Sequence, residues 1–194
     1  MNKRTLAGLG LAVALTVSGV SPQAAMAYPP GRVLTVTSSV NLLQYRSGTF
    51  IEANHLAAGS LKFSVNGKLG KYFPIYASGS SQKWPFWPKA PGKYDVVATS
   101  GLESASTSVY VPLQTFPRAV SVRKSFTINL KYVAPGTAVY ATVNGKRVAS
   151  GTADANGLLT LVAPPGSFTR GVANQLLINY GGAFTGGAPI KALR

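Results

Sequence analysis

The sequence of 194 residues contains no cysteine, one histidine and only four acidic residues. Without cysteine, the chain can form no disulfide, thiol nucleophile or cysteine-ligated metal site. Carboxylate-driven catalysis and metal cages need clustered acids, but Glu52, Asp95, Glu103 and Asp154 are scattered along the sequence. These absences predict a protein that is not an enzyme and that uses no cofactor and no metal.

Long hydrophobic runs are missing after the first 27 residues. The chain begins with the cationic segment Met1–Thr5, continues with the apolar run Leu6–Val20, and then shows the small-x-small pattern Ala25–Ala27. This order is typical of a secretory signal peptide, and the run is short for about 30 Å of hydrocarbon. We predict a signal peptide over residues 1–27 and an exported mature chain with no transmembrane segment. An uncleaved anchor helix is the alternative.

The remaining sequence alternates apolar and polar residues with a period of two, and helical periodicity is nearly absent. Examples are Leu61–Val65, Tyr94–Thr99, Phe126–Lys131 and Leu176–Tyr180. Turn-forming pairs separate these runs, namely Asn66-Gly67, Pro91-Gly92, Pro135-Gly136, Asn144-Gly145, Asn156-Gly157 and Pro165-Gly166. Asn-Gly between alternating runs is a strong hairpin signal. The mature chain is therefore predicted to be all-β, built as sandwiches or barrels.

An internal repeat predicts two domains. The segment Val65–Lys68 returns, identical, as Val143–Lys146, an offset of 78 residues. Two weaker matches accompany it: Phe50-Ile51 with Phe126-Thr127, and Ala90–Gly92 with Pro164–Gly166. Units of about 80 residues suit a small β-sandwich. We predict domains over residues 28–114 and 115–194, and a single larger domain is the alternative.

Two stretches resemble a known family. Ala134–Thr137 gives a Pro-Gly turn before an alternating strand, Gly151–Leu158 contains Asp-x-x-Gly before the next strand, and Pro91–Thr99 gives Pro-Gly-x-Tyr. These motifs resemble secreted actinobacterial, Gram-positive proteins with tandem Ig-like domains. The first repeat departs from the pattern at Ala77–Gln82, which lacks the Asp-x-x-Gly element. The resemblance implies two tandem immunoglobulin-like β-sandwich domains after a cleaved signal peptide, with an extracellular, non-enzymatic role.

Basic residues outnumber acidic ones by 19 to 4, for a formal net charge of +15. Loss of Lys3 and Arg4 with the signal peptide leaves +13, divided as +5 in the first predicted domain and +8 in the second. The densest pairs, Arg123-Lys124 and Lys146-Arg147, both belong to the second domain. On neighbouring hairpins they would form one cationic patch that attracts polyanions. A high net charge also improves solubility, and this simpler explanation stays open.

The segment Trp84-Pro85-Phe86-Trp87-Pro88 contains both tryptophans, between Lys83 and Lys89. Aromatic faces can stack on sugar rings, and flanking lysines suit an acidic glycan. Trp84, Phe86 and Trp87 are therefore predicted as binding residues, together with the two basic pairs. The alternative is that at least one tryptophan packs in a sandwich core.

Together these features predict a secreted, non-catalytic module at the cell exterior, possessing affinity for an anionic cell-wall polymer or acidic glycan. Two alternatives remain: a protein-interaction module that uses a sheet edge near Gly181-Gly182 and Gly186-Gly187, or a glycan-acting enzyme that uses Glu52 or Glu103. His55 is interpreted as a loop histidine. Nucleic acid is the least favoured partner, because no reader motif is present.

Overall fold

The computed structural model describes residues 33–193, and every regular element in this range is a β-strand. The fold is all-β, as predicted. Within the same range, no helix has the length and hydrophobicity needed to cross a membrane. The predicted signal peptide lies outside the described residues.

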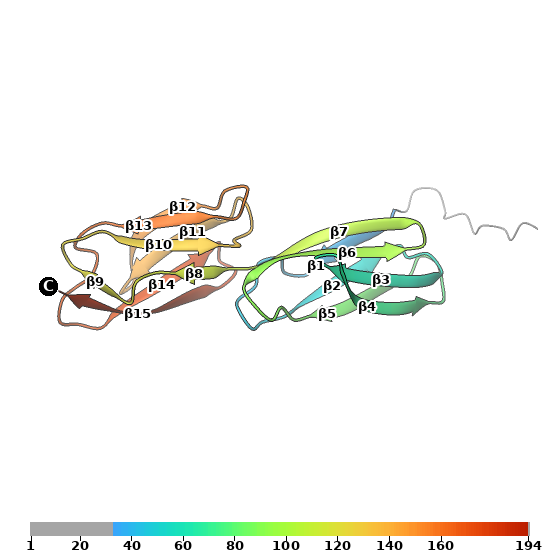
Figure 1. Cartoon of the computed structure of the whole chain (residues 1–194), viewed down its shortest axis with the longest axis horizontal. Coiled ribbons are helices and arrows are strands. Elements are labelled where there is room, and N and C mark those ends of the chain that lie inside the picture. The colour runs from blue at the N-terminus through green and yellow to red at the C-terminus, as the bar shows by residue number, and fades with distance from the viewer. Residues whose placement is uncertain (1–32, 194) are drawn as a thin grey trace, which may run out of the picture. The chain divides into compact units, whose positions relative to one another are not determined.

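Residues 33–111 contain seven strands in two sheets, ordered β1-β2-β5 and β4-β3-β6-β7 (Figure 1). The strands are β1 (Thr35–Ser38), β2 (Thr49–Asn54), β3 (Gly59–Val65), β4 (Lys68–Ile75), β5 (Ser81–Phe86), β6 (Gly92–Ser100) and β7 (Glu103–Val111). Apolar side chains from both sheets meet between them, as with Ile51 and Phe63, which are fully buried. We call this two-layered unit the first sandwich.

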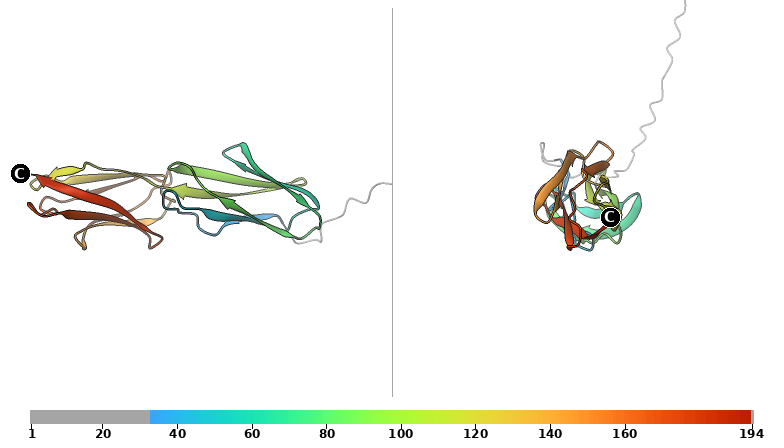
Figure 2. Two further views of the ribbon diagram at one scale, coloured as in Figure 1. Left: turned by 90° about the horizontal axis from the view of Figure 1, so that it is seen from below. Right: turned by 90° about the vertical axis from the view of Figure 1, so that its left-hand side faces the viewer.

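Residues 113–193 contain eight strands, again in two sheets, ordered β13-β10-β8 and β12-β11-β14-β15-β9. The strands are β8 (Leu113–Thr115), β9 (Ala119–Ser121), β10 (Phe126–Lys131), β11 (Ala138–Val143), β12 (Lys146–Thr152), β13 (Leu159–Ala163), β14 (Asn174–Tyr180) and β15 (Thr185–Leu193). Ile128 and Ile178 are buried between the sheets of this second sandwich. Figure 2 shows both sandwiches as pairs of layers.

The two sandwiches share one topology. The order β1-β2-β5 corresponds to β8-β10-β13, and β4-β3-β6-β7 corresponds to β12-β11-β14-β15. In each sandwich a segment also pairs in parallel with the last strand, through Leu42 and Tyr110 in the first and through β9 and β15 in the second. This strand order is immunoglobulin-like, so the prediction of two tandem immunoglobulin-like sandwiches is confirmed.

The sheets change at Pro112, because β7 ends at Val111 and β8 begins at Leu113. β8 pairs with β10 and is therefore part of the second sandwich. The domain boundary between residues 114 and 115 stays a prediction, and the strand pairing supports a division close to it.

The repeated Asn-Gly segment forms the same hairpin in both sandwiches. Asn66 and Asn144 have φ of 49° and 50°, and the glycines that follow also have positive φ, as a type I′ turn requires. Each asparagine side chain also accepts a backbone N–H from the adjacent strand. The donor is Asp95 of β6 (2.8 Å) in the first sandwich and Gln175 of β14 (2.8 Å) in the second. The match at an offset of 78 is structurally equivalent.

The two weaker sequence matches are not equivalent in the structure. Phe50 is exposed on β2, whereas Phe126 is buried on β10, and the shared burial pattern aligns Thr49 with Phe126 instead. Pro91-Gly92 directly adjoins β6, whereas Pro165-Gly166 lies early in a longer loop before β14. The Phe50 match is out of register by one residue, and such a slip reverses the face of every side chain on a strand. The Pro-Gly match consists of common turn residues and arose by chance.

Gly157 provides a test of the second sandwich's packing. Its φ is +72°, and a Cβ at this position would lie 2.5 Å from the Val133 carbonyl oxygen. Gly136 has a similar φ of +77° but open space around the same position. Left-handed backbone costs a non-glycine residue about 1–2 kcal/mol. We expect Gly136→Ala to lower the free energy of unfolding by about that amount and Gly157→Ala by clearly more, measured by urea unfolding; equal losses would contradict the close approach.

Candidate anion-binding site

The basic residues of the second sandwich gather at one end. This is the end where β10 and β14 begin and where β11, β13 and β15 finish. Of the eight Lys and Arg residues in the described range 113–193, seven lie on the turns and strand ends there; we call them the basic end: Arg118, Arg123, Lys124, Lys146, Arg147, Arg170 and Lys191. Lys131 lies at the opposite end of β10. The strand order thus concentrates charges that are far apart in sequence.

Residues 113–193 contain no side-chain carboxylate at this end of the sandwich to neutralise these cations. The only acid of the described second sandwich is Asp154, in the turn before β13 at the opposite end, where its carboxylate accepts the N–H groups of Asn156 (2.9 Å) and Leu158 (2.8 Å). In residues 113–193 no ion pair forms. A field that is not cancelled locally reaches further into solvent and attracts polyanions.

In the first sandwich, by contrast, two of the lysines form ion pairs. Lys83 pairs with Glu52 (3.4 Å) and Lys93 with Asp95 (2.9 Å). The Ser108 hydroxyl donates to Asp95, and this bond, followed by the contact with Lys93, holds the pKa of the Asp95 carboxyl below its usual value. The hydrogen bond to Asp95 raises the pKa of Lys93. Part of the basic excess in this sandwich is therefore compensated.

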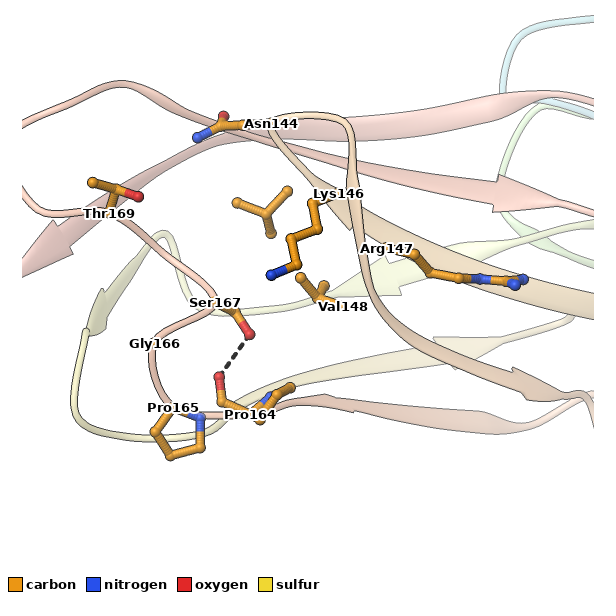
Figure 3. A pocket seen from close by; sticks show the side chains of 10 residues that line it. Asn144, Lys146, Arg147, Val148, Pro164, Pro165, Gly166, Ser167 and Thr169 are labelled. Atoms are coloured by element: carbon orange, nitrogen blue, oxygen red, sulfur yellow. Dashed lines mark hydrogen bonds between the residues drawn. The ribbon is translucent and has the colours of Figure 1, made fainter.

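A groove of about 420 Å³ opens at the basic end between two segments (Figure 3). One wall is the β11–β12 hairpin around Asn144, and the other is the start of the loop between β13 and β14. The lining combines apolar and polar side chains: Val143, Asn144, Lys146, Arg147, Val148, Pro164, Pro165, Gly166, Ser167 and Thr169. Its volume is in the range of ordinary small-ligand sites.

Lys146 and Arg147 point in different directions. The ammonium group of Lys146 reaches into the groove toward Ser167, whereas Arg147 extends away from it (Figure 3). The guanidinium of Arg147 lies over the ring of Tyr140, 4.3 Å from its centroid, in a cation–π contact. Neighbouring residues on a strand face opposite sides, so both residues of the predicted pair line the groove but only Lys146 directs its charged group into it.

Arg123 and Lys124 adjoin the other wall of the groove. They lie in the turn from β9 to β10, directly after Val122. The carbonyl of Val122 accepts the N–H of Gly166 (2.8 Å), which ties this turn to the loop between β13 and β14, which we call the groove loop. Three of the four predicted cations thus border the groove loop, and their binding role stays a prediction.

Asn174, the first residue of β14, holds the groove loop between β13 and β14. Its side chain is fully buried; Oδ1 accepts the N–H of Thr169 (2.8 Å), and Nδ2 donates to the carbonyls of Thr169 (2.8 Å) and Val172 (3.1 Å). The Asn144 amide donates to the same Oδ1 (3.3 Å), which connects the hairpin to the loop. Phe168 packs in the core beside Phe126, with ring centroids 4.9 Å apart. Both walls are therefore held before any ligand arrives.

The aromatic segment of the first sandwich lies mostly inward. Phe86 is buried, and Trp84 packs on Phe63, with ring centroids 5.3 Å apart. Trp84 is half-buried and also packs on Phe86, with ring centroids 5.4 Å apart, as the core-packing alternative expected. Trp87 is 66% exposed and its indole covers Gly48, where a Cβ would come within 2.7 Å of the ring. Of the three predicted aromatic residues, Trp87 is the most exposed, and their binding role stays a prediction.

The acids considered for catalysis have partners of their own. Glu52 pairs with Lys83 on the β2–β5 ladder, and Glu103 accepts the N–H of Leu34 (2.9 Å). His55 has φ of 62°, and its Nδ1 lies 3.2 Å from the Val33 carbonyl oxygen. These contacts give the three residues structural roles in the strands and turns that carry them.

Sequence reasoning missed Arg118, Arg170, Lys191 and Asn174 as parts of this site. The three cations stand singly in the sequence and carry no local signal. Their association depends on the order of strands, as where the N–H of Lys191 donates to the Arg118 carbonyl (3.0 Å). The Asn174 network likewise depends on the loop path, which periodicity does not reveal.

Comparison with known proteins returns structural likeness alone. No protein-family model matches the sequence, and no curated protein is detectably similar. Among solved structures, the adhesin InvE of Yersinia pseudotuberculosis is 11% identical with a TM-score of 0.34, over 83% of this chain and 59% of InvE. A C-terminal intimin fragment, solved with the intimin-binding domain of its receptor Tir, is 13% identical with a TM-score of 0.43, over 80% of this chain and 62% of the fragment. At such scores no partner or activity carries over.

The Asn174 network yields a stability prediction. Asn174→Ala removes three hydrogen bonds to the backbone of Thr169 and Val172 and one to the Asn144 amide, each with a net value of about 0.5–1.5 kcal/mol. We expect the free energy of unfolding to fall by about 2–4 kcal/mol and amide hydrogen exchange at Thr169 to accelerate. Asn129→Ala is the control, because this exposed asparagine bonds only the Thr160 hydroxyl and should change stability by no more than about 0.5 kcal/mol. Similar losses in both variants would contradict the bracing role.

Proposed function

We propose that this chain is an exported, non-catalytic binding module that associates with an anionic polymer of the cell envelope through the basic end of its second sandwich. Export rests on the predicted signal peptide over residues 1–27. The anionic polymer is a cell-wall polymer or an acidic glycan, and the actinobacterial resemblance makes the wall the expected place.

The observation that carries this proposal is the one-sided charge of the second sandwich. Its basic end holds seven cations, while Asp154 lies at the other end and forms no ion pair in the described range. A linear polyanion can contact several such cations at once and release its counterions, which favours binding. A wall polymer also offers many identical sites, so modest affinity suffices for retention.

A protein partner is the second candidate, and one observation favours it. β15 pairs with β9 only over Lys191–Leu193, so Thr185–Ile190 has a strand neighbour on one side only. An open strand edge can accept an extended segment from another protein. Such binding would depend on main-chain hydrogen bonds and would respond weakly to salt.

The proposal predicts salt-sensitive retention on anionic polymers. Mature protein should bind immobilised poly(glycerol phosphate) or polygalacturonate and should not bind neutral dextran. With about three cations in contact, the affinity should fall roughly tenfold when the salt concentration rises about threefold, by analogy with single-stranded nucleic acids. Equilibrium binding at several salt concentrations measures this, and retention that does not change with salt would favour the protein partner instead.

Two variants of equal net charge separate a site from a general charge effect. The first carries Arg123→Gln, Lys124→Gln and Arg170→Gln at the basic end. The second carries Lys62→Gln, Lys68→Gln and Lys89→Gln in the first sandwich, where all three lysines are exposed and form no ion pair within residues 33–193. We expect the first variant to lose about tenfold or more in affinity and the second to bind nearly as wild type. Equal losses would leave solubility as the role of the charge.

A further inference from the structure

The groove beside Lys146 has the form of a ligand subsite within the basic end. Its lining has an apolar part and a polar part, and these indicate the class of ligand that it binds. Val143, Val148, Pro164 and Pro165 supply apolar surface, while Lys146 and the hydroxyls of Ser167 and Thr169 supply polar groups. A sugar or polyol has the same mixed character, with C–H faces and hydroxyl edges. A single cation pointing inward complements one negative charge per bound unit.

We infer that this groove holds one anionic sugar or polyol unit of the polymer, with the Lys146 ammonium group bound to its phosphate or carboxylate. The inference rests on the proposed function and adds the subsite and its ligand class. The carbon skeleton of the unit packs on Pro164, Pro165 and Val148. Arg123 and Lys124, in the turn bonded to Gly166, then meet the charges of neighbouring units.

The groove is already formed, which lowers the cost of binding. The hairpin wall is joined to Asn174 through Asn144, and the loop wall is held by Asn174, by Val122 and by the buried ring of Phe168. The Ser167 hydroxyl also donates to the Pro164 carbonyl (2.7 Å) and closes the turn of the loop (Figure 3). A ligand therefore does not have to order these segments.

The first sandwich shows what the same position looks like when it is filled. Strand pairing aligns Gly70 with Val148 and Trp84 with Leu161. A Cβ on Gly70 would lie 2.7 Å from the Trp84 ring, so the indole occupies the space beside this strand. The indole thus fills the space beside Gly70, whereas Val148, the counterpart of Gly70, lines an open groove together with Lys146.

The loop wall also differs between the sandwiches. Paired residues are offset by 77 before the loop (Trp84 and Leu161) and by 80 after it (Val96 and Leu176), so the second loop is longer by three residues. The longer loop contains the Pro-Pro-Gly turn and the segment braced by Asn174. The smaller side chain at Leu161 leaves space for the groove, and the longer loop forms one of its walls.

Lys146 and Arg147 form a matched pair for the test. Lys146→Ala and Arg147→Ala each remove one positive charge from adjacent, exposed residues of one hairpin, but only Lys146 points into the groove. The probes are short oligomers of glycerol phosphate and of galacturonate, with a neutral dextran oligomer as control, titrated by calorimetry and by NMR of the Ser167 and Thr169 amides. Preference for one anionic oligomer identifies phosphate or carboxylate as the recognised group.

We expect Lys146→Ala to weaken binding of the preferred oligomer about tenfold or more, the loss of one hydrogen bond to a charged group. Arg147→Ala should cost no more than about threefold, as for a screened surface charge. Lys146→Arg, which keeps the charge, should recover most of the affinity. The Ser167 and Thr169 signals should shift with the anionic oligomers and not with dextran.

Equal losses from Lys146→Ala and Arg147→Ala, with polymer binding still salt-sensitive, would overturn the subsite and leave the proposed function standing. Binding of the dextran oligomer as strong as that of the anionic ones would also overturn it, because the lysine would then have no role. Failure of the wild-type chain to bind either long polyanion would instead refute the proposed function itself.

Discussion

The buried amide of Asn174 is the interaction on which the basic end depends. One side chain joins the start of β14, the preceding loop and, through Asn144, the β11–β12 hairpin. Removed from water, its donors and acceptor must find protein partners, so the loop can satisfy them in only one path. That path places Pro164–Thr169 opposite Lys146 and so creates the groove. In the first sandwich the corresponding residue is Tyr94, whose hydroxyl bonds the backbone of Ala90, in the manner of a tyrosine corner.

The two sandwiches have the same topology but differ in the size of the side chains at equivalent core positions. Phe63, Trp84 and Gly70 in the first sandwich correspond to Ala141, Leu161 and Val148 in the second. A large ring against a glycine and a leucine against a valine are two ways to fill an interior at normal density. The Trp84 ring fills the space beside Gly70 in the first copy, and in the second copy the corresponding Val148 lines the groove.

The sequence was sufficient for the fold, because alternation and turn chemistry are local. Asn66-Gly67 and Asn144-Gly145 demand positive φ and form the predicted hairpins, and the runs between turns form the predicted strands. The site was less accessible. Arg118, Arg170 and Lys191 come together only through strand order, and adjacent Lys146 and Arg147 separate because a strand alternates its faces. The inward turn of Trp84 and Phe86 likewise depends on register, so the sequence could offer core packing of a tryptophan only as an alternative to ligand binding.

The placement of the cations distinguishes a binding role from a solubilising role better than their number does. A net positive charge keeps a domain soluble wherever the charges are placed, and like charges gathered at one end repel each other and destabilise the folded state. Spreading them over both ends would give the same solubility with less repulsion. The second sandwich instead holds seven cations at one end and its only described acid at the other. Repulsion of this kind is relieved when a polyanion binds, so the arrangement favours a ligand-binding role over a purely solubilising one.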